Sequence, residues 1–443
     1  MEIFFDLTYW KSVLGLNYWT GYLGSIIVSA GNSTDDICIP IPPDKFDKTD
    51  PEKIQLELLK ILVDNNYSRK ILTPADGFNV LTVGSIHQDA SEVDFSQAQF
   101  LQKRNLFILH GLVSPHSRFG LGHNKSIKPE ILMPGGRSLF RKAPIQMNPL
   151  HTKFKMDPAE WNVPPGNKVA WPGHSGQFNH VVYTCGTSNA AALTTNLAGQ
   201  LYEVLLELNS TGDEDKKIDE NYFALVIKTL LVHGASWGEE ADLIKNIVKE
   251  LPAVPSNGVK RRVSPFIGYG GVNGERVLDC TEGRVTLIGT GSLCAQDGEN
   301  AHEFKFPLPP SLSGKVMEKK LVATLAWFSP INVLSNRYRK AHLYMENLMK
   351  NESLGLKGQS YDLNQSSKGT VQHQILRGES ADVLIEDNYL TIKVNCRKDA
   401  SGMENWEKVP YALAVTLEIP ENIEVNIYEE IKERIQERVR PRN

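Results

Sequence analysis

The sequence predicts an α/β domain built on a parallel sheet, followed by a β-sandwich domain. In the first part of the chain, segments with helical spacing of apolar residues alternate with short apolar runs, which is typical of a parallel sheet. From about residue 283, short β-rich runs separated by Pro, Gly, Asn and Ser clusters replace this alternation. We therefore expect one domain over residues 1–282 and a second over residues 283–443, with the boundary close to Cys280.

Local signals predict the elements of the first domain in order. Apolar spacing predicts a helix over residues 7–20 before a strand over 25–30, and Asp50-Pro51 begins a helix that continues to about Asn66. A short strand is expected over residues 105–111. The segment over residues 137–180 is rich in Pro, Gly, His and Trp and shows little periodicity. It is expected to form a long loop. Further helices are expected over 189–208, 219–233 and 238–251.

The second domain is expected to contain about eight strands, which suits a β-sandwich or a jelly roll. The expected strands cover residues 284–289, 302–308, 319–327, 341–346, 369–376, 381–385, 389–396 and 410–419. A charged helix over residues 427–439 is expected to follow them, with its Glu, Lys and Arg side chains in solvent.

Composition and charge are those of an ordinary globular protein. The chain has 443 residues, of which 41% are hydrophobic and 23% charged, and a formal net charge of −4 with both signs mixed. This charge argues against a nucleic-acid partner, and no apolar run approaches the roughly 20 residues of a membrane-spanning helix, so no membrane partner is expected. Five cysteines are scattered without a C-x-x-C pair, which favours a reduced, cytoplasmic protein without a metal or another cofactor.

A lone serine, Ser188, follows a Gly-Thr turn and stands at the head of the helix expected over residues 189–208. At a helix N-terminus, unpaired backbone N–H groups and the positive end of the helix dipole stabilise negative charge that develops beside a hydroxyl. Ser188 is therefore a candidate nucleophile. The alternative interpretation is that Ser188 only caps the helix, because Ser is a preferred N-cap residue.

Three further stretches accompany Ser188. They are the strand end Ser29-Ala30-Gly31-Asn32, the Pro/Gly turn and apolar run over 73–85, and Ser117-Arg118-Phe119-Gly120 followed by Lys128-Pro129-Glu130-Ile131. Together with Gly186-Thr187-Ser188, these motifs stand in the order found in the subtilisin-like serine peptidases (subtilases), which the chain resembles. The resemblance implies a partial subtilisin-like domain and an endopeptidase that hydrolyses peptide bonds in peptide or protein substrates.

The resemblance also implies roles for single residues. Ser188 matches the nucleophile, and Asn32 matches the side-chain donor of the oxyanion hole. Four residues match substrate-binding positions: Ser29, Ala30, Gly31 and Thr187. Residues 265–273 are similar to the signature near the end of a subtilase domain, which agrees with a boundary close to Cys280. Residues 325–330 are similar to a strand end in the jelly-roll domains that follow several subtilase domains.

The Asp and His that complete the family's catalytic triad are not recognised in this sequence. In subtilases they precede the oxyanion Asn, so here they would lie upstream of Met1. We therefore expect a separate N-terminal segment that carries the Asp and the His as a partner, and we expect this chain alone to be inactive. A serine hydroxyl without a base is a weak nucleophile.

None of the chain's own histidines resembles the missing base. His110 begins a His-Gly pair but falls after Asn32 in the sequence, and the helix-ending His233 is expected to act as a C-terminal cap. His174 and His180 come shortly before Ser188 and are expected near the active site. His116 and His123 are further loop residues.

Two functions of other classes compete with the peptidase. A non-catalytic peptide-binding or scaffold protein, derived from a subtilase, would use the same surfaces for recognition alone. An α/β-hydrolase is disfavoured, because residues 186–190 lack the second Gly of the Gly-x-Ser-x-Gly turn.

Overall fold

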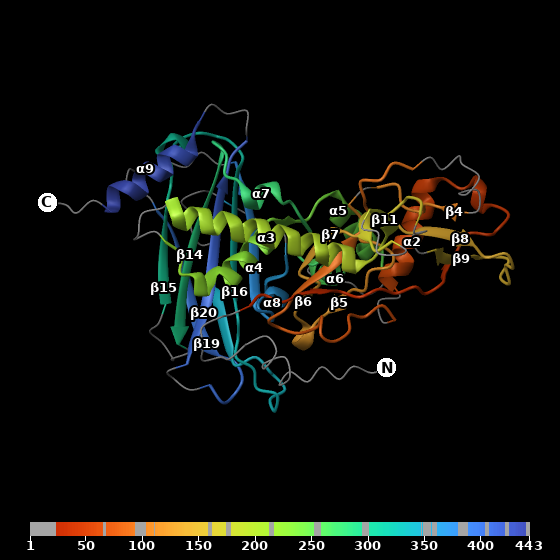
Figure 1. The fold of residues 1–443 in the computed structure, drawn as a ribbon, viewed down its shortest axis with the longest axis horizontal. Coiled ribbons are helices and arrows are strands. Elements are labelled where there is room, and N and C mark those ends of the chain that lie inside the picture. Colours follow the sequence, from red (N-terminus) through yellow and green to blue (C-terminus); the bar gives the residue numbers. More distant parts are fainter. Residues whose placement is uncertain are drawn as a thin grey trace. The chain divides into compact units, whose positions relative to one another are not determined.

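The computed structural model describes most of the chain (Figure 1). The described residues are 24–64, 68–93, 103–109, 111–157, 162–173, 179–211, 217–251, 258–294, 301–346, 348, 356, 361–379, 389–403, 407–420 and 425–439. The helix predicted over 7–20 and the strand predicted over 381–385 lie outside them, as do His110 and His174. Within the described part, none of the helices combines the length and the apolar character that crossing a membrane requires.

Residues contact one another mainly within two compact units. The parallel-sheet unit contains Ile27–Leu197 and Ala235–Val272, and the antiparallel unit contains Ala198–Gly234 and Asn273–Asn443. Helix α3 (Thr187–Thr211) therefore contributes residues to both. The predicted boundary between residues 282 and 283 stays a prediction, and the antiparallel unit takes in helical residues that precede it.

The parallel-sheet unit is built on a five-stranded sheet. In spatial order its strands are β1 (Ile27–Ser29), β3 (Leu81–Ile86), β7 (Ile131–Pro134), β13 (Gly271–Val272) and β12 (Ala235–Ser236). The strands β1, β3, β7 and β13 run parallel to one another, and β12 pairs antiparallel with β13. All six residues of β3 are buried, as expected for a central strand of a parallel sheet. The predicted α/β sheet is thus present, with β1 at its edge among the described residues.

Three helices of this unit share one apolar core. They are α2 (Pro51–Asp64), α5 (Glu239–Glu250) and α6 (Val259–Ile267). Asp50 begins α2 as predicted, because its carboxylate accepts a hydrogen bond from the Glu52 N–H at 3.2 Å. The face of α2 that carries Leu58, Leu59 and Leu62 is buried in the core. The helices predicted from Asp50 and over 238–251 are confirmed within the described residues.

The expectation of one long loop over residues 137–180 was wrong. This segment contains three strands: β8 (Leu139–Lys142), β9 (Thr152–Asp157) and β10 (Asn167–Trp171). A fourth strand, β11 (His180–Thr184), begins at its last residue. Along β9, buried Thr152, Phe154 and Met156 alternate with exposed Lys153 and Lys155. This is the period of a half-buried strand. The signal is only six residues long, which is why the surrounding Pro and Gly residues obscured it.

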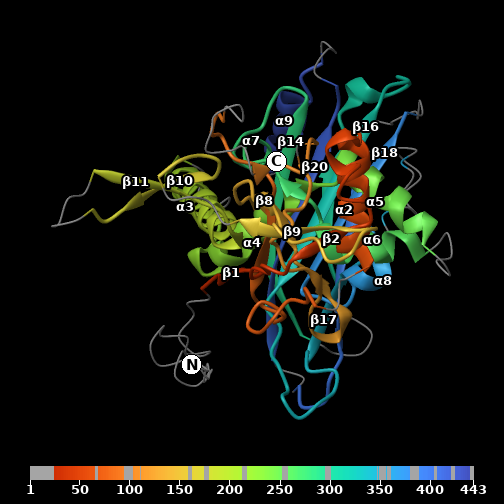
Figure 2. The same cartoon turned by 90° about the vertical axis from the view of Figure 1, so that its right-hand side faces the viewer.

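Two small antiparallel groups arise from these strands. One is a four-stranded sheet in the order β2 (Ile37–Ile39), β9, β8 and β4 (Lys103–Arg104). The short strand expected over 105–111 is therefore displaced to residues 103–104. The other is the ribbon of β10 and β11, which Figure 2 shows leading into α3. A further short pair joins β5 (Gly120–Leu121) to β6 (Ile127–Lys128).

The antiparallel unit contains two sheets. The first has the order β14 (Arg284–Cys294), β20 (Lys408–Glu418), β16 (Lys319–Trp327) and β18 (Val371–Gly378). The second has the order β15 (Ala301–Pro307), β19 (Tyr389–Lys398) and β17 (Ala341–Met345). Among the described residues, each predicted β-rich run of this region coincides with one of these strands. Two antiparallel sheets around one core are compatible with the predicted β-sandwich.

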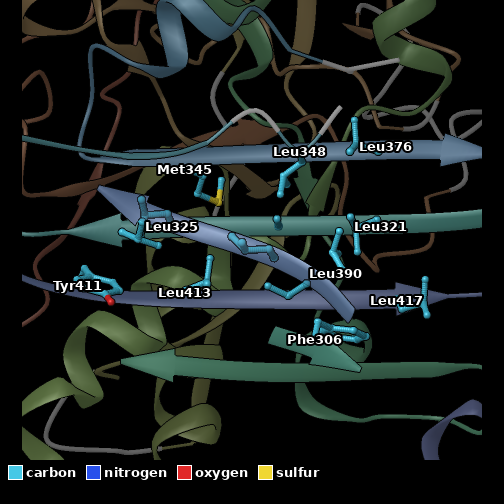
Figure 3. Packing of buried hydrophobic residues seen from close by; sticks show 14 of the residues in the cluster. Phe306, Leu321, Leu325, Met345, Leu348, Leu376, Leu390, Tyr411, Leu413 and Leu417 are labelled. Atoms are coloured by element: carbon cyan, nitrogen blue, oxygen red, sulfur yellow. The ribbon is translucent and has the colours of Figure 1, made fainter. Parts of the chain in front are cut away.

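Apolar side chains from both sheets form a single core (Figure 3). Leu321 and Leu325 of β16 meet Leu413 and Leu417 of β20 from the first sheet, and Leu390 of β19 enters from the second. Successive core residues along a strand are separated by one residue that points to the other face. The feature that made the strands predictable is the series of β-rich runs bounded by Pro, Gly, Asn and Ser residues.

Helices also pack in the antiparallel unit. Helix α4 (Phe223–His233) contacts β16 and β20, which confirms most of the helix predicted over 219–233. The terminal helix α9 (Ile427–Val439) places Ile427 and Ile431 in the core. Two short helices complete the unit, α7 (Glu275–Leu278) and α8 (Leu363–Ser366).

Candidate functional site

The residues that follow β1 turn toward the start of α3. Ser29 pairs with Val83 of β3, and the Ala30 N–H donates to the Val83 carbonyl at 2.8 Å. Gly31 then adopts a φ of +92°, a conformation that L-residues with a side chain rarely adopt. This turn at Gly31 carries Asn32 out of the line of the strand. The local geometry depends on the Gly that precedes the Asn.

Asn32 is joined to Thr187 although 155 positions separate them in the sequence. Its side-chain oxygen Oδ1 accepts hydrogen bonds from the Thr187 N–H at 2.9 Å and from the Thr187 hydroxyl at 3.1 Å. The Thr187 hydroxyl in turn accepts from the Gly31 N–H at 3.1 Å. Since two donors hold Oδ1, the other end of the amide, Nδ2, is the end that can donate to a further group.

Ser188 lies in the first turn of α3, exposed to solvent. Because α3 begins at Thr187, Ser188 is inside the helix, and the simple N-cap interpretation is wrong. Gly186 allows the close approach of Asn32, since a Cβ atom built on Gly186 would lie 3.2 Å from Asn32 Nδ2. The structure thus brings together Asn32, Thr187 and the start of the helix that carries Ser188.

Asn189 fastens the turn before Ser188, a role that sequence reasoning missed. Its side-chain Nδ2 donates to the Thr184 carbonyl and to the Thr184 hydroxyl, both at 2.9 Å. The Thr184 hydroxyl donates to Asn189 Oδ1 at 3.1 Å. An Asn beside a Ser gives no sequence signal of this kind, because the partner belongs to the preceding strand β11.

Arg118 donates hydrogen bonds to the backbone carbonyls of Gly31 and Asn32. Its backbone N–H donates to the Gly31 carbonyl at 2.9 Å, and its side-chain Nε donates to the Asn32 carbonyl at 3.1 Å. Its Nη1 donates to the Lys70 carbonyl at 3.0 Å. The motif Ser-x-Phe-Gly therefore contributes through its variable residue, which the sequence alone did not single out.

A buried histidine, His116, lies next to this segment in the sequence. Its Nδ1 is 2.8 Å from Ser114 Oγ and 2.6 Å from Ser138 Oγ, and its Nε2 is 3.1 Å from Ser85 Oγ. Burial, with smaller contributions from nearby His87 and Arg69, lowers the pKa of His116 to about 3. The hydrogen bonds of the buried ring thus go to three serines, and none of them goes to Ser188.

The other candidate histidines are also placed. His180 is exposed at the start of β11, and His123 is exposed in a short 3₁₀ helix. His233 ends α4, but its ring bonds to Thr324 Oγ1 at 2.8 Å and to Thr416 Oγ1 at 2.6 Å, so its expected role as a helix cap was wrong. In the described part of the chain, no histidine ring forms a hydrogen bond with Ser188.

Residues 16–270, more than half of the chain, match the subtilase family. The chain belongs to the subtilase family. No curated protein matches it. The family match confirms the resemblance that the sequence motifs carried. It supports a function of the serine-peptidase type, acting on peptides or proteins.

In this subtilase, two of the expected substrate-binding residues are fully enclosed. Ala30 and Thr187 are buried, and their polar backbone or side-chain groups bond within the protein. Ser29 and Gly31 are half-buried. Among the described residues, no group of three or more His, Cys, Asp or Glu side chains could hold a metal ion.

Proposed function

We propose that this subtilase chain supplies the nucleophile and the oxyanion hole of a serine endopeptidase. The observation that carries the proposal is the pair of hydrogen bonds from Thr187 to Asn32 Oδ1, which leaves Asn32 Nδ2 as a donor beside the start of α3. In acyl transfer, donors of this kind stabilise the negative oxygen of the tetrahedral intermediate. Ser188 is the hydroxyl in the same turn.

The proposed reaction is acyl transfer in two stages. Ser188 Oγ forms a bond to the peptide carbonyl carbon while its proton passes to a His base, and the carbonyl oxygen becomes an oxyanion. Asn32 Nδ2 and the Ser188 N–H, which lies in the first helical turn without an intrahelical acceptor, donate to that oxygen. The peptide C–N bond then breaks as the His returns the proton to the leaving amine, and water releases the acyl group.

We further propose that the His and its Asp belong to a separate segment that binds this chain. Two observations support this. The histidines that the structure describes form no hydrogen bond with Ser188. Strand β1 is an edge strand of the described sheet, so a further strand can pair with it. On this proposal the chain alone is a very poor peptidase.

We extend the proposal to the substrate-binding residues, to the architecture of the antiparallel unit and to localisation. Ser29 and Gly31 contact substrate, whereas the enclosed Ala30 and Thr187 act by holding Asn32 in place. The two antiparallel sheets form a jelly-roll-like sandwich, and the protein is cytoplasmic.

The competing proposal is a non-catalytic peptide-binding protein, which the lack of a base beside Ser188 in the described part favours.

A fluorophosphonate probe tests the proposal, because it labels a serine only when a base activates the hydroxyl. The purified chain is expected to label weakly at Ser188. Adding the polypeptide encoded directly upstream, with its Asp and His motifs, is expected to restore labelling. Ser188→Ala should abolish that labelling, and His116→Gln should leave it in place.

Strong labelling of the chain alone, lost in Ser188→Ala, would show that a histidine of this chain is the base. Binding of peptides without labelling in any mixture would favour the non-catalytic alternative. The second result would overturn the peptidase proposal itself.

A further inference from the structure

The hairpin of β8 and β9 ends in a loop with an unusual distribution of side chains. Residues 143–151, called the tip loop, connect the two strands (Figure 1). Three of its apolar residues face solvent: Ile145 is 76% exposed, Met147 is 93% exposed and Leu150 is 65% exposed. Single exposed apolar residues are common on proteins, but three within six positions form a small apolar projection.

The two amide side chains of the tip loop, Gln146 and Asn148, bond to nearby backbone groups. Gln146 Nε2 donates to the Ala143 carbonyl at 2.7 Å and to the Lys153 carbonyl at 3.1 Å, and Gln146 Oε1 accepts from the Lys153 N–H at 2.7 Å. Asn148 Oδ1 accepts from the Leu150 N–H at 2.8 Å. The loop therefore uses its amide side chains to hold its own backbone and presents its apolar side chains to water.

The strands that carry the tip loop are basic. The sheet of β2, β9, β8 and β4, with the aspartates that pair with it, has six basic and three acidic side chains, which gives 6 − 3 = +3 in a chain of net charge −4. These charged residues are Lys103, Arg104, Arg141, Lys142, Lys153, Lys155, Asp36, Asp47 and Asp157. Lys155 lies directly opposite Arg141, and among the described residues it has no ion pair. The basic charge is thus only partly neutralised.

We propose that the tip loop is a membrane-docking element for a lipid surface that carries anionic headgroups. Ile145, Met147 and Leu150 enter the boundary between headgroups and acyl chains, while Lys155 and Arg141 meet the lipid phosphates. Apolar insertion and basic charge are each weak, and together they give reversible binding. A protein partner fits less well, because a stable interface needs about 800 Å² on each side and a pocket for its anchors, and three aliphatic side chains on a loop supply neither.

This proposal does not depend on the peptidase assignment. It departs from the expectation of no membrane partner, which rested on the lack of a membrane-spanning run. A short loop that enters only the surface of a bilayer leaves no such run in the sequence. Docking would bring the protein to substrates held at that surface.

The test is co-sedimentation of the full chain with vesicles of phosphatidylcholine alone or with about 30% phosphatidylglycerol, a composition chosen to supply anionic headgroups. We expect binding to the anionic vesicles that weakens as salt is raised from about 0.1 M to 0.5 M. Ile145→Ser/Met147→Ser/Leu150→Ser should lower the partition coefficient about tenfold or more, because binding scales with buried apolar area. Lys155→Gln should lower it about fivefold.

The matched control is Val333→Ser/Leu334→Ser, which removes two apolar side chains that are 69% and 93% exposed elsewhere. It should bind like the wild type. The proposal is overturned if the wild type does not bind anionic vesicles. It is also overturned if the control variant loses as much binding as the triple variant of the tip loop. It is also overturned if sedimentation velocity shows that the tip loop instead mediates self-association, lost in the triple variant.

Discussion

Replacing His116 should remove part of the acid sensitivity of the parallel-sheet unit. The His116 ring is buried, sits among Ser85, Ser114 and Ser138, and has its pKa lowered to about 3 by burial. In the unfolded chain a histidine has a pKa of about 6.5. Between these two values the unfolded state binds a proton that the folded state does not. Stability is therefore lost as pH falls below about 6.5.

The size of this effect follows from the two pKa values. The pH value of 5 lies about 1.5 units below the pKa of a histidine in the unfolded chain, and each pH unit corresponds to about 1.4 kcal/mol. His116 should therefore reduce the free energy of unfolding by about 2 kcal/mol between pH 7 and pH 5. The loss continues toward pH 3, where the folded ring begins to bind the proton as well.

Hydrogen exchange measured by mass spectrometry separates the units of the chain, which need not unfold together. Between pH 7 and pH 5, the opening free energies of β3 and β7 peptides should fall in the wild type. In His116→Gln this fall should be smaller by about 2 kcal/mol. Peptides of β16 and β20 should behave alike in both proteins. His123→Gln, which replaces an exposed histidine of the same unit, should keep the wild-type pH dependence. If His116→Gln keeps it too, the ring is not held neutral.

Two further predictions concern residues around Asn32 and β7. Glu130→Gln leaves the buried Lys128 ammonium, 2.5 Å from Glu130 Oε1, without its counter-charge, and should cost about 3–5 kcal/mol in urea unfolding. The double variant Lys128→Met/Glu130→Gln should recover part of the lost stability. Equal stability of the single and the double variant would contradict this prediction. Arg118→Met removes donors to the Asn32 and Lys70 carbonyls and should cost about 1–2 kcal/mol. Unchanged amide exchange around Gly31 would refute that role.

The predictable parts of the fold were those with a strong local period. The buried run of β3, the amphipathic α2 and the long β-rich runs of β16 and β20 each carry their own pattern within a few residues. The sheet of β2, β9, β8 and β4 does not, because its strands are two to six residues long and come from three distant parts of the chain. Pairing between such strands is a tertiary property, which local reasoning over 137–180 could not reach.

The candidate site divides in the same way. Ser188 and Asn32 were candidates because a motif surrounds each of them, whereas the sequence did not single out Arg118 and Asn189. Their contribution depends on which carbonyl or hydroxyl lies opposite, such as the Asn32 carbonyl for Arg118 and Thr184 for Asn189. A motif reveals a residue type at a position, and only the folded chain reveals the partner.

Among the described residues, the hydrogen bonds that orient Asn32 lie within the parallel-sheet unit. Thr187 holds the side-chain Oδ1, Arg118 holds the carbonyl, and the segment at Ser117 pairs with Asn32 as an isolated bridge. Among the described residues, the Asn32 side chain is thus held without a hydrogen bond to a histidine ring. Preorganised donors retain much of their effect when the base is lost, since they require no rearrangement during the reaction. On the function proposed above, Asn32 can therefore keep the geometry of an oxyanion donor before a base from a separate segment binds.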